Sequence, residues 1–160
     1  KYLIRYPDIR TLKAQKGVEQ WEIMQIYLTV SGPGETRRIR QVVSAGGIKY
    51  YKAVKKRLTD LANEEDEGEI DQLEYIHLCQ EQQPGCKPVG KTRYRIPYEG
   101  HILEFDIYPF WDDRAILEIE LEHENEGAAI PEYVRIIRDV SADPAYKNRS
   151  LAENVIYEEI

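Results

Sequence analysis

Apolar and acidic residues alternate strictly over residues 117–121, Leu-Glu-Ile-Glu-Leu. Because successive side chains of a strand point to opposite faces, this pattern predicts a strand that places Glu118 and Glu120 on one face. The two carboxylates would then lie roughly 6–7 Å apart, which is two strand rises. That spacing suits a hard cation held between them. An ordinary half-buried strand shows the same alternation, and taken alone the stretch favours that simpler interpretation.

Similar alternation elsewhere predicts further strands. The predicted strands, including the one that contains Glu118, are Lys1–Ile4, Trp21–Val30, Glu35–Ala45, Ile48–Leu58, Val89–Tyr98, His101–Tyr108 and Arg114–Glu124. The turns at 31–34 and 46–47 are too short for a crossover, so the strands they join must be antiparallel. Helices are predicted over 7–15, 70–82 and 131–138 and near Leu151. The acidic run 63–69 is interpreted as a solvated approach to the second helix.

The charged residues of these strands separate by sign when they are sorted by face. The basic faces carry Arg38 and Arg40, then Tyr51, Lys55 and Arg57, then Lys91, Arg93 and Arg95. The acidic faces carry Glu104 and Asp106, then Glu118 and Glu120. A solvated face normally mixes signs, because like charges in a row destabilise a sheet. We therefore expect a ligand that neutralises both kinds of row, and a polyphosphate bound to a divalent cation does so.

Antiparallel strands with one charged face and one apolar face can close into a barrel. The apolar face would point outward and pack beneath helices, and the charged face would line a water-filled tunnel. The sequence therefore predicts an α+β fold, an antiparallel β-barrel with a charged interior and helices packed on the outside.

Length and composition narrow the class of protein. A chain of 160 residues suits a single domain, residues 1–160, with a sizeable core. The formal charge of −7 argues against nucleic acid as the default partner. The two cysteines, Cys79 and Cys86, are too few to staple the fold and indicate reduced thiols, so we expect a cytoplasmic protein. The apolar runs are far shorter than a membrane span, so no membrane partner is expected.

Five residue pairs resemble a known family in their order and spacing. They are Arg38-Ile-Arg40, Ala53-Val-Lys55, Lys91-Thr-Arg93, Glu104-Phe-Asp106 and Glu118-Ile-Glu120. Each pair is a weak signal, but five in register over nearly the whole chain resemble the CYTH superfamily, the triphosphate tunnel metalloenzymes. The resemblance implies an eight-stranded antiparallel tunnel that binds triphosphate-containing substrates with Mg²⁺ or Mn²⁺. Members include inorganic tripolyphosphatases, thiamine triphosphatases, RNA triphosphatases and class IV adenylate cyclases.

The resemblance also implies roles for the matched residues. The expected phosphate ligands are Lys1, Arg38, Arg40, Lys55, Arg57, Lys91 and Arg93. The expected metal ligands are Glu118, Glu120, Asp106, Glu104, Glu65 and Glu67. The expected catalytic residues are Glu118, Glu120 and Lys55. Arg114 begins its strand in phase with Glu118, and would be a further phosphate ligand or an internal partner for a carboxylate.

The chain departs from the family's pattern at two places. Of the signature Glu-x-Glu-x-Lys, only the lysine is represented, as Lys1. We expect the native protein to carry the two glutamates upstream of this chain. Ala53 stands where many members of the family have threonine.

Three functions fit this interpretation. The favoured one is a divalent-metal-dependent hydrolase of inorganic tripolyphosphate or a nucleoside triphosphate, which releases orthophosphate by metal-assisted attack of water. The second is a class IV-type adenylate cyclase, although no base-reading signature is visible. The third is a non-catalytic module that binds polyphosphate or nucleotides. The sequence leaves the preferred triphosphate and the oligomeric state open, a homodimer included. Lys147 and Arg149 in the tail either close one end of the tunnel or are surface charges, and the second interpretation is favoured.

Overall fold

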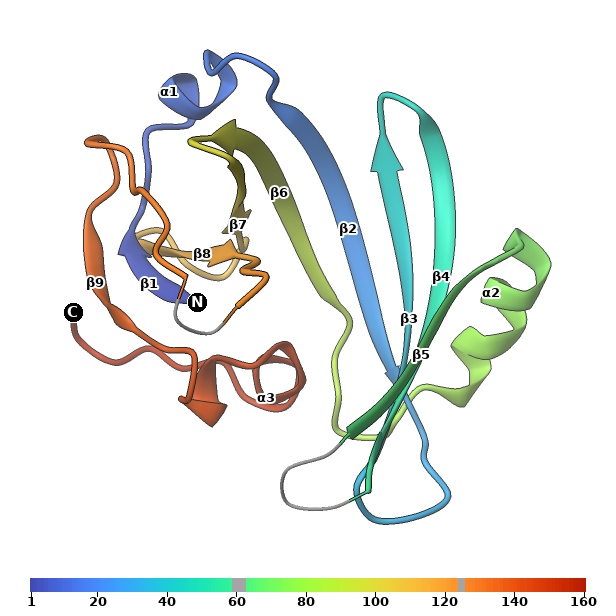
Figure 1. Ribbon diagram of the computed structural model, residues 1–160. Helices are drawn as coiled ribbons and strands as arrows, with labels where there is room; N and C mark the ends of the chain where they lie inside the picture. The colour runs from blue at the N-terminus through green and yellow to red at the C-terminus, as the bar shows by residue number, and fades with distance from the viewer. Residues whose placement is uncertain (59–62, 124–125) are drawn as a thin grey trace.

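The computed structural model describes residues 1–58, 63–123 and 126–160. Within these ranges, nine strands form one antiparallel sheet with three short α-helices (Figure 1). The strands are β1 Tyr2–Arg5, β2 Glu19–Leu28, β3 Glu35–Ser44, β4 Gly47–Arg57, β5 Asn63–Ile70, β6 Val89–Tyr98, β7 His101–Ile107, β8 Arg114–Ile119 and β9 Ile136–Asp139. The helices are α1 Ile9–Lys13, α2 Gln72–Leu78 and α3 Asn148–Glu153, with 3-10 turns at Cys79–Glu81 and Pro144–Tyr146. None of the helices in the described ranges has the length and apolar character needed to cross a membrane.

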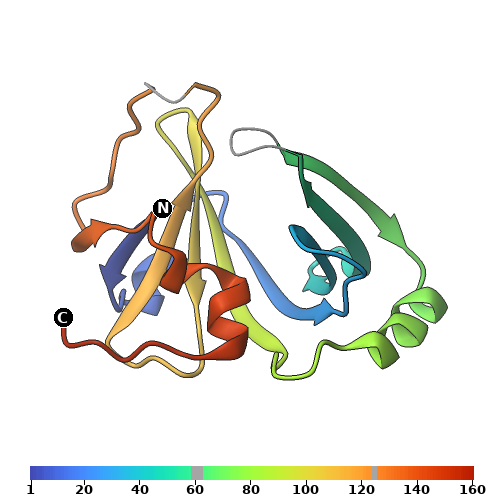
Figure 2. The same ribbon diagram turned by 90° about the horizontal axis from the view of Figure 1, so that it is seen from below.

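The strand order is β5-β4-β3-β2-β6-β7-β8-β1-β9, so β5 and β9 are the edges of the sheet. The predicted antiparallel arrangement is confirmed. The sheet differs from the predicted eight-stranded barrel, because it has nine strands and no ladder joins its two edges in the described residues. Figure 2 shows the two arms of the sheet spread apart. Both edge strands carry charged side chains, which disfavour pairing between edges.

Two segments form strands where the sequence predicted other structure. Residues 63–69 form most of β5, because their acidic side chains lie opposite bases on β4; Lys55, for example, is directly opposite Glu65. Residues 131–138 do not form the predicted helix. The chain turns at Pro131, and Ile136–Asp139 pairs with β1. Backbone pairing with β1 therefore outweighs the helix-start signal of the proline.

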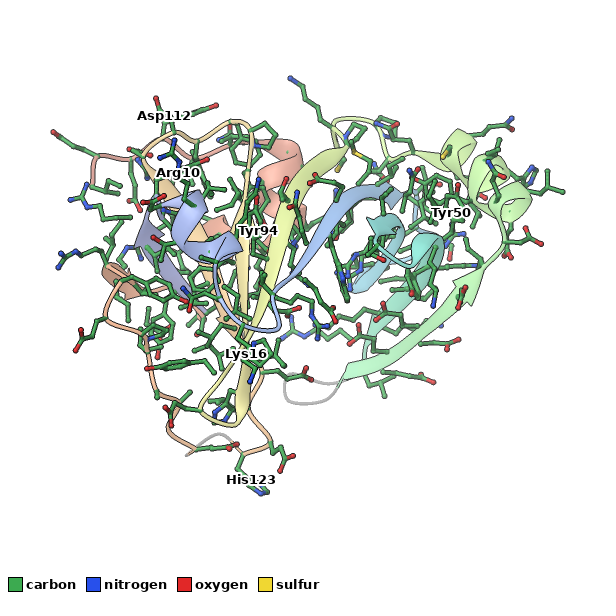
Figure 3. All side chains as sticks on the ribbon, turned by 90° about the horizontal axis from the view of Figure 1, so that it is seen from above. Arg10, Lys16, Tyr50, Tyr94, Asp112 and His123 are labelled. Carbon is green, nitrogen blue, oxygen red and sulfur yellow. The ribbon has the colours of Figure 1, made fainter. Side chains whose placement is uncertain are left out.

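Two helices cover the apolar faces of the sheet from outside, as the sequence predicted. The α1 core contains the buried residues Ile4, Leu12, Tyr94, Ile96, Leu103, Phe105, Ala115 and Leu117. The α2 core contains the buried residues Ile26, Leu28, Ile39, Tyr75 and Leu78. In Figure 3, Tyr94 lies beside α1, whereas Tyr50, which packs against the α2 core, lies in the other arm beside α2. The strand faces opposite these two cores are left to form the concave side of the sheet.

The C-terminal segment packs on the concave side, where the sequence predicted only charged residues. The tail core contains the buried residues Leu3, Tyr27, Cys86, Val89, Tyr108, Trp111, Ile116, Val140, Tyr146, Leu151 and Ala152. Leu3 and Ile116 point to this side because they alternate along β1 and β8 with residues of the α1 core. The prediction that all helices pack outside is therefore wrong for α3, which lies within the curve of the sheet (Figure 2).

Candidate active site

A cavity of about 890 Å³ lies between the arm formed by β3, β4 and β5 and the C-terminal segment. Its cationic lining residues are Lys1, Arg38, Lys55, Arg57, Lys147 and Arg149. Its acidic lining residues are Glu35 and Glu65. Cations therefore outnumber carboxylates six to two among the described residues that line the cavity. Such a surface attracts an anion that carries several charges.

The strands position the basic side chains of one wall. Arg38 on β3 lies directly opposite Ala53 on β4, and Lys55 lies opposite Glu65 on β5. Because side chains alternate along each strand, Arg38, Ala53 and Lys55 all face the concave side. Ala53 is small and 6% exposed, so it leaves space between Arg38 and Lys55.

The guanidinium group of Arg40 lies within electrostatic range of those of Arg38 and Arg93. Arg40 donates hydrogen bonds from Nε and Nη2 to Oε1 of Gln25, at 3.2 and 2.9 Å. Burial lowers the pKa of Arg40, and the positive charges of Arg38 and Arg93 lower it further, while Glu67 opposes them. This arrangement of like charges is unfavourable in the free protein, and an anion bound among the three arginines would relieve it.

An ionic network lies between β6 and β7. Lys91 donates to Asp106 at 2.7 Å, and Arg93 donates to both carboxylate oxygens of Asp106 at 2.7 and 2.9 Å. Arg93 also donates to Glu104 at 3.2 Å, and Arg95 does so at 3.1 Å. Burial lowers the pKa of Lys91 to about 8, although Asp106 opposes the shift. The two predicted metal ligands of β7 thus already accept hydrogen bonds from the bases of β6.

Glu118 connects this network with the large cavity. One of its carboxylate oxygens lies 3.4 Å from Nζ of Lys1, and the other lies 4.0 Å from Nη2 of Arg93. The Glu118 side chain is 33% exposed, and Glu120 follows β8 at the surface. These contacts are longer than those of Asp106, so Glu118 is the carboxylate of the network that is most accessible to a ligand.

The acidic residues fit a divalent metal only in part. Among the described residues, no three Asp, Glu, His or Cys side chains are grouped so that they could hold a metal by themselves. Mg²⁺ does not need such a cage, because one or two carboxylates together with substrate phosphates and water complete its octahedral shell. Glu118 near the end of β8 and Glu120 just beyond it are both accessible and two positions apart, and they fit that kind of site.

The structure distributes the predicted site residues over several places. Those that line the large cavity are Lys1, Arg38, Lys55, Arg57 and Glu65. Arg40 and Glu67 line an adjoining cavity of about 300 Å³. Lys91, Arg93, Glu104, Asp106 and Glu118 form the network described above.

Arg114 lies apart from these groups. It is buried, and it donates to Asp113 at 2.8 and 3.0 Å and to the backbone carbonyl of Glu158 at 2.5 Å. Of the two roles predicted for Arg114, the structure places it in that of an internal partner, paired with Asp113 rather than with a glutamate of its own strand.

Sequence reasoning considered a contribution of the C-terminal segment to the tunnel but did not favour it. Lys147 and Arg149 line the large cavity, whereas the sequence interpreted them as surface charges. Arg149 contacts the sulfur of Cys86, and its guanidinium lies 5.5 Å from the ring centroid of Tyr27. No local pattern around these residues could have indicated this, because their position depends on packing of the distant Tyr146 and Leu151 in the tail core.

Comparison with known proteins agrees with this geometry, although no family model matches the chain. The inorganic triphosphatase of Acetivibrio thermocellus is 34% identical over 114 residues, which are 66% of this chain and 67% of that protein. The crystal structure of the inorganic triphosphatase NE1496 matches with a TM-score of 0.61 and 24% identity, over 96% of this chain and 92% of that one.

A more distant likeness in fold is to the PH1819 protein from Pyrococcus horikoshii OT3, with a TM-score of 0.54 and 17% identity over 77% of this chain and 79% of that one. The two solved structures bear on the fold alone. The identity to the A. thermocellus protein, together with the charged residue pairs on the concave side of the sheet, shows the relationship. The chain belongs to the CYTH superfamily, the triphosphate tunnel metalloenzymes.

Proposed function

We propose that this protein is a divalent-metal-dependent hydrolase of triphosphate-containing substrates that releases orthophosphate. The observation that carries the proposal is the 890 Å³ cavity with cations on both walls and few carboxylates. A triphosphate is a compact anion with about the charge that this lining would neutralise. The name of the A. thermocellus relative, inorganic triphosphatase, supports the same substrate class.

In this proposal the two walls hold the phosphates between them. Arg38, Lys55 and Arg57 bind from the β3–β4 arm, and Lys147 and Arg149 bind from the C-terminal segment. Arginine donates in a planar fork that matches phosphate oxygens, whereas lysine acts as a point charge. Gripping the chain of phosphates from both sides fixes the reacting phosphorus, and phosphoryl transfer depends mainly on such positioning and charge stabilisation.

Glu118 and Glu120 would hold Mg²⁺ or Mn²⁺ at the edge of the cavity, next to Lys1. When bound, such an ion supplies charge neutralisation at the phosphates and lowers the pKa of water. Lys1 and Arg93 flank the Glu118 carboxylate and would hold it in position beside the cavity.

A panel of substrates and metals tests the proposal. The protein is incubated with tripolyphosphate or ATP and with Mg²⁺, Mn²⁺ or EDTA, and the products are quantified. We expect orthophosphate with either metal and none with EDTA. Pyrophosphate with cyclic AMP would instead identify a cyclase, and saturable binding without any product would identify a binding module. Equal orthophosphate release in EDTA would contradict the metal requirement.

A further inference from the structure

The strand β5 is the last strand of one arm of the sheet, so one side of its backbone has no neighbouring strand (Figure 2). In the part of the chain that the structure describes, its backbone pairs with β4 alone. Five of its eight residues are acidic and exposed, namely Glu64, Glu65, Asp66, Glu67 and Glu69. An unpaired edge of this length is a template on which a further strand can form.

The register determines which residues present their backbone at the free edge of β5. Arg57 of β4 donates its N–H to the carbonyl of Gly34 at 2.9 Å, so its backbone groups face β3, and every second residue before it does the same. Opposite residues of an antiparallel pair either face each other or both face away. The residues of β5 whose N–H and C=O face the free edge are therefore Glu65, Glu67 and Glu69.

The neighbouring strand balances only part of the negative charge of β5. It places lysines directly opposite Glu64 and Glu65, but it places the uncharged Val54, Ala53 and Tyr51 opposite the other three acidic residues. None of these three carboxylates takes part in an ion pair between described residues. Basic side chains on a strand at the free edge would lie across from them and supply the missing positive charge.

The edge of a second β5 cannot supply these basic side chains, because pairing two acidic strands would place like charges opposite one another. We propose that the free edge of β5 binds an extended basic segment of a partner protein, which adds to the sheet as an antiparallel strand. Main-chain hydrogen bonds to Glu65, Glu67 and Glu69 contribute affinity, and alternate lysines or arginines across from these residues contribute specificity. The proposal does not depend on the hydrolase activity.

Fluorescence anisotropy with a labelled peptide tests this proposal. The peptide alternates lysine and threonine over eight residues, the length of β5, and is titrated with the full chain at physiological salt. Two derivatives of equal charge are N-methylated at the lysines or at the threonines. The lysines lie opposite the residues whose backbone faces the free edge, so their N–H groups donate to β5, whereas those of the threonines point away.

We expect the parent peptide and the threonine-methylated peptide to bind saturably in the micromolar range, and the lysine-methylated peptide to bind at least tenfold more weakly. Equal binding of the two methylated peptides would show that charge alone attracts them, and would overturn the proposal. Absence of binding of the parent peptide would overturn it as well.

Glu69→Pro and Glu69→Gln are a matched pair of protein variants. Both remove the same charge, and only proline also removes the N–H that faces the free edge, while the hydrogen bonds to β4 remain. The affinity for the parent peptide should fall at least tenfold in Glu69→Pro and less than threefold in Glu69→Gln. Equal effects of the two substitutions would contradict strand addition. Self-association of the wild-type chain that Glu69→Pro abolishes would place a second copy on this edge, and would also overturn the proposal.

Discussion

Asp106 illustrates what can and cannot be predicted from single residues. The alternation along its strand correctly places Asp106 and Glu104 on one charged face. The resemblance to the CYTH superfamily implied a metal-binding role for both. The structure pairs Asp106 with Lys91 and Arg93, because β6 and β7 are neighbours and Arg93 lies directly opposite Asp106. The face of a residue follows from its own strand, whereas its partner depends on which strand becomes the neighbour.

Replacing Asp106 with Asn should strongly destabilise the protein. The substitution leaves Lys91 and Arg93 buried with one neutral amide between them, and breaking a buried ion pair in this way costs about 3–5 kcal/mol. Urea unfolding followed by circular dichroism measures the change. Glu104→Gln is the control, because that side chain is 18% exposed and its loss should cost clearly less. Equal stability of Asp106→Asn and wild type would refute the structural role assigned to Asp106.

Replacing Arg38 with Ala should weaken substrate binding more than turnover. Arg38 lines the large cavity, whereas Glu118 and Glu120 are not among its described lining residues, so Arg38 should contribute mainly to holding the phosphates. We expect KM for tripolyphosphate to rise at least tenfold and kcat to change less. Arg10→Ala, at an exposed position of α1 (Figure 3), should leave both constants unchanged. A fall in kcat with KM unchanged would place Arg38 in the chemical step instead.

At the scale of elements, the strands that were predicted correctly are those whose own sequence shows a clear alternating pattern. β3 and β6 alternate clearly, and their predicted ranges agree with the structure to within one residue. β5 has acidic residues on both faces and β9 is four residues long, so neither shows a useful pattern of its own. β5 forms because β4 offers complementary charges, and β9 forms because β1 offers an open edge. A local sequence pattern contains neither of these contacts.

The docking of α2 on the sheet should weaken in alkaline solution through Tyr75. Burial raises the pKa of Tyr75 to about 12, and its ring centroid lies 4.7 Å from that of Tyr50 on β4. A raised folded pKa means that the contribution of Tyr75 is complete below about pH 10 and is lost between about pH 10 and 12. Tyr75→Phe removes this ionisation.

The unfolding free energy of wild type and of Tyr75→Phe, measured by urea denaturation between pH 9 and 11, checks the expectation. The wild-type value should fall more steeply than that of the variant as the pH rises. Parallel curves would show that Tyr75 ionises equally in the folded and unfolded states, contrary to its buried position against Tyr50.

At the scale of the whole molecule, the sheet curves around its charged side, and in the part of the chain that the structure describes its edge strands β5 and β9 do not pair with each other. The open side is covered by the C-terminal segment, whose Tyr146 and Leu151 anchor it in the tail core while Lys147 and Arg149 face the cavity. The division of each strand into a charged and an apolar face was predictable from alternation. The nine-strand open sheet and the contribution of the tail were not, because they depend on contacts between segments far apart in the chain.

The central claim is that the concave face, and not the outer face, binds the triphosphate. Charge reversal at two adjacent lysines of β4 tests it most directly. Lys55 lines the large cavity and lies opposite Glu65, whereas Lys56 is the next residue, points to the other face and lies opposite Glu64. Lys55→Glu and Lys56→Glu therefore change net charge equally. The first places a glutamate across from Glu65, and the second places one across from Glu64 on β5 and Glu35 on β3.

Titration calorimetry with tripolyphosphate compares the two variants with the wild-type protein. We predict that Lys55→Glu weakens binding at least tenfold and that Lys56→Glu changes it by less than twofold, because only the first charge faces the bound anion. Equal weakening by both substitutions would mean that net charge alone attracts the ligand, and a larger effect of Lys56→Glu would place the site on the outer face; either result would contradict the account.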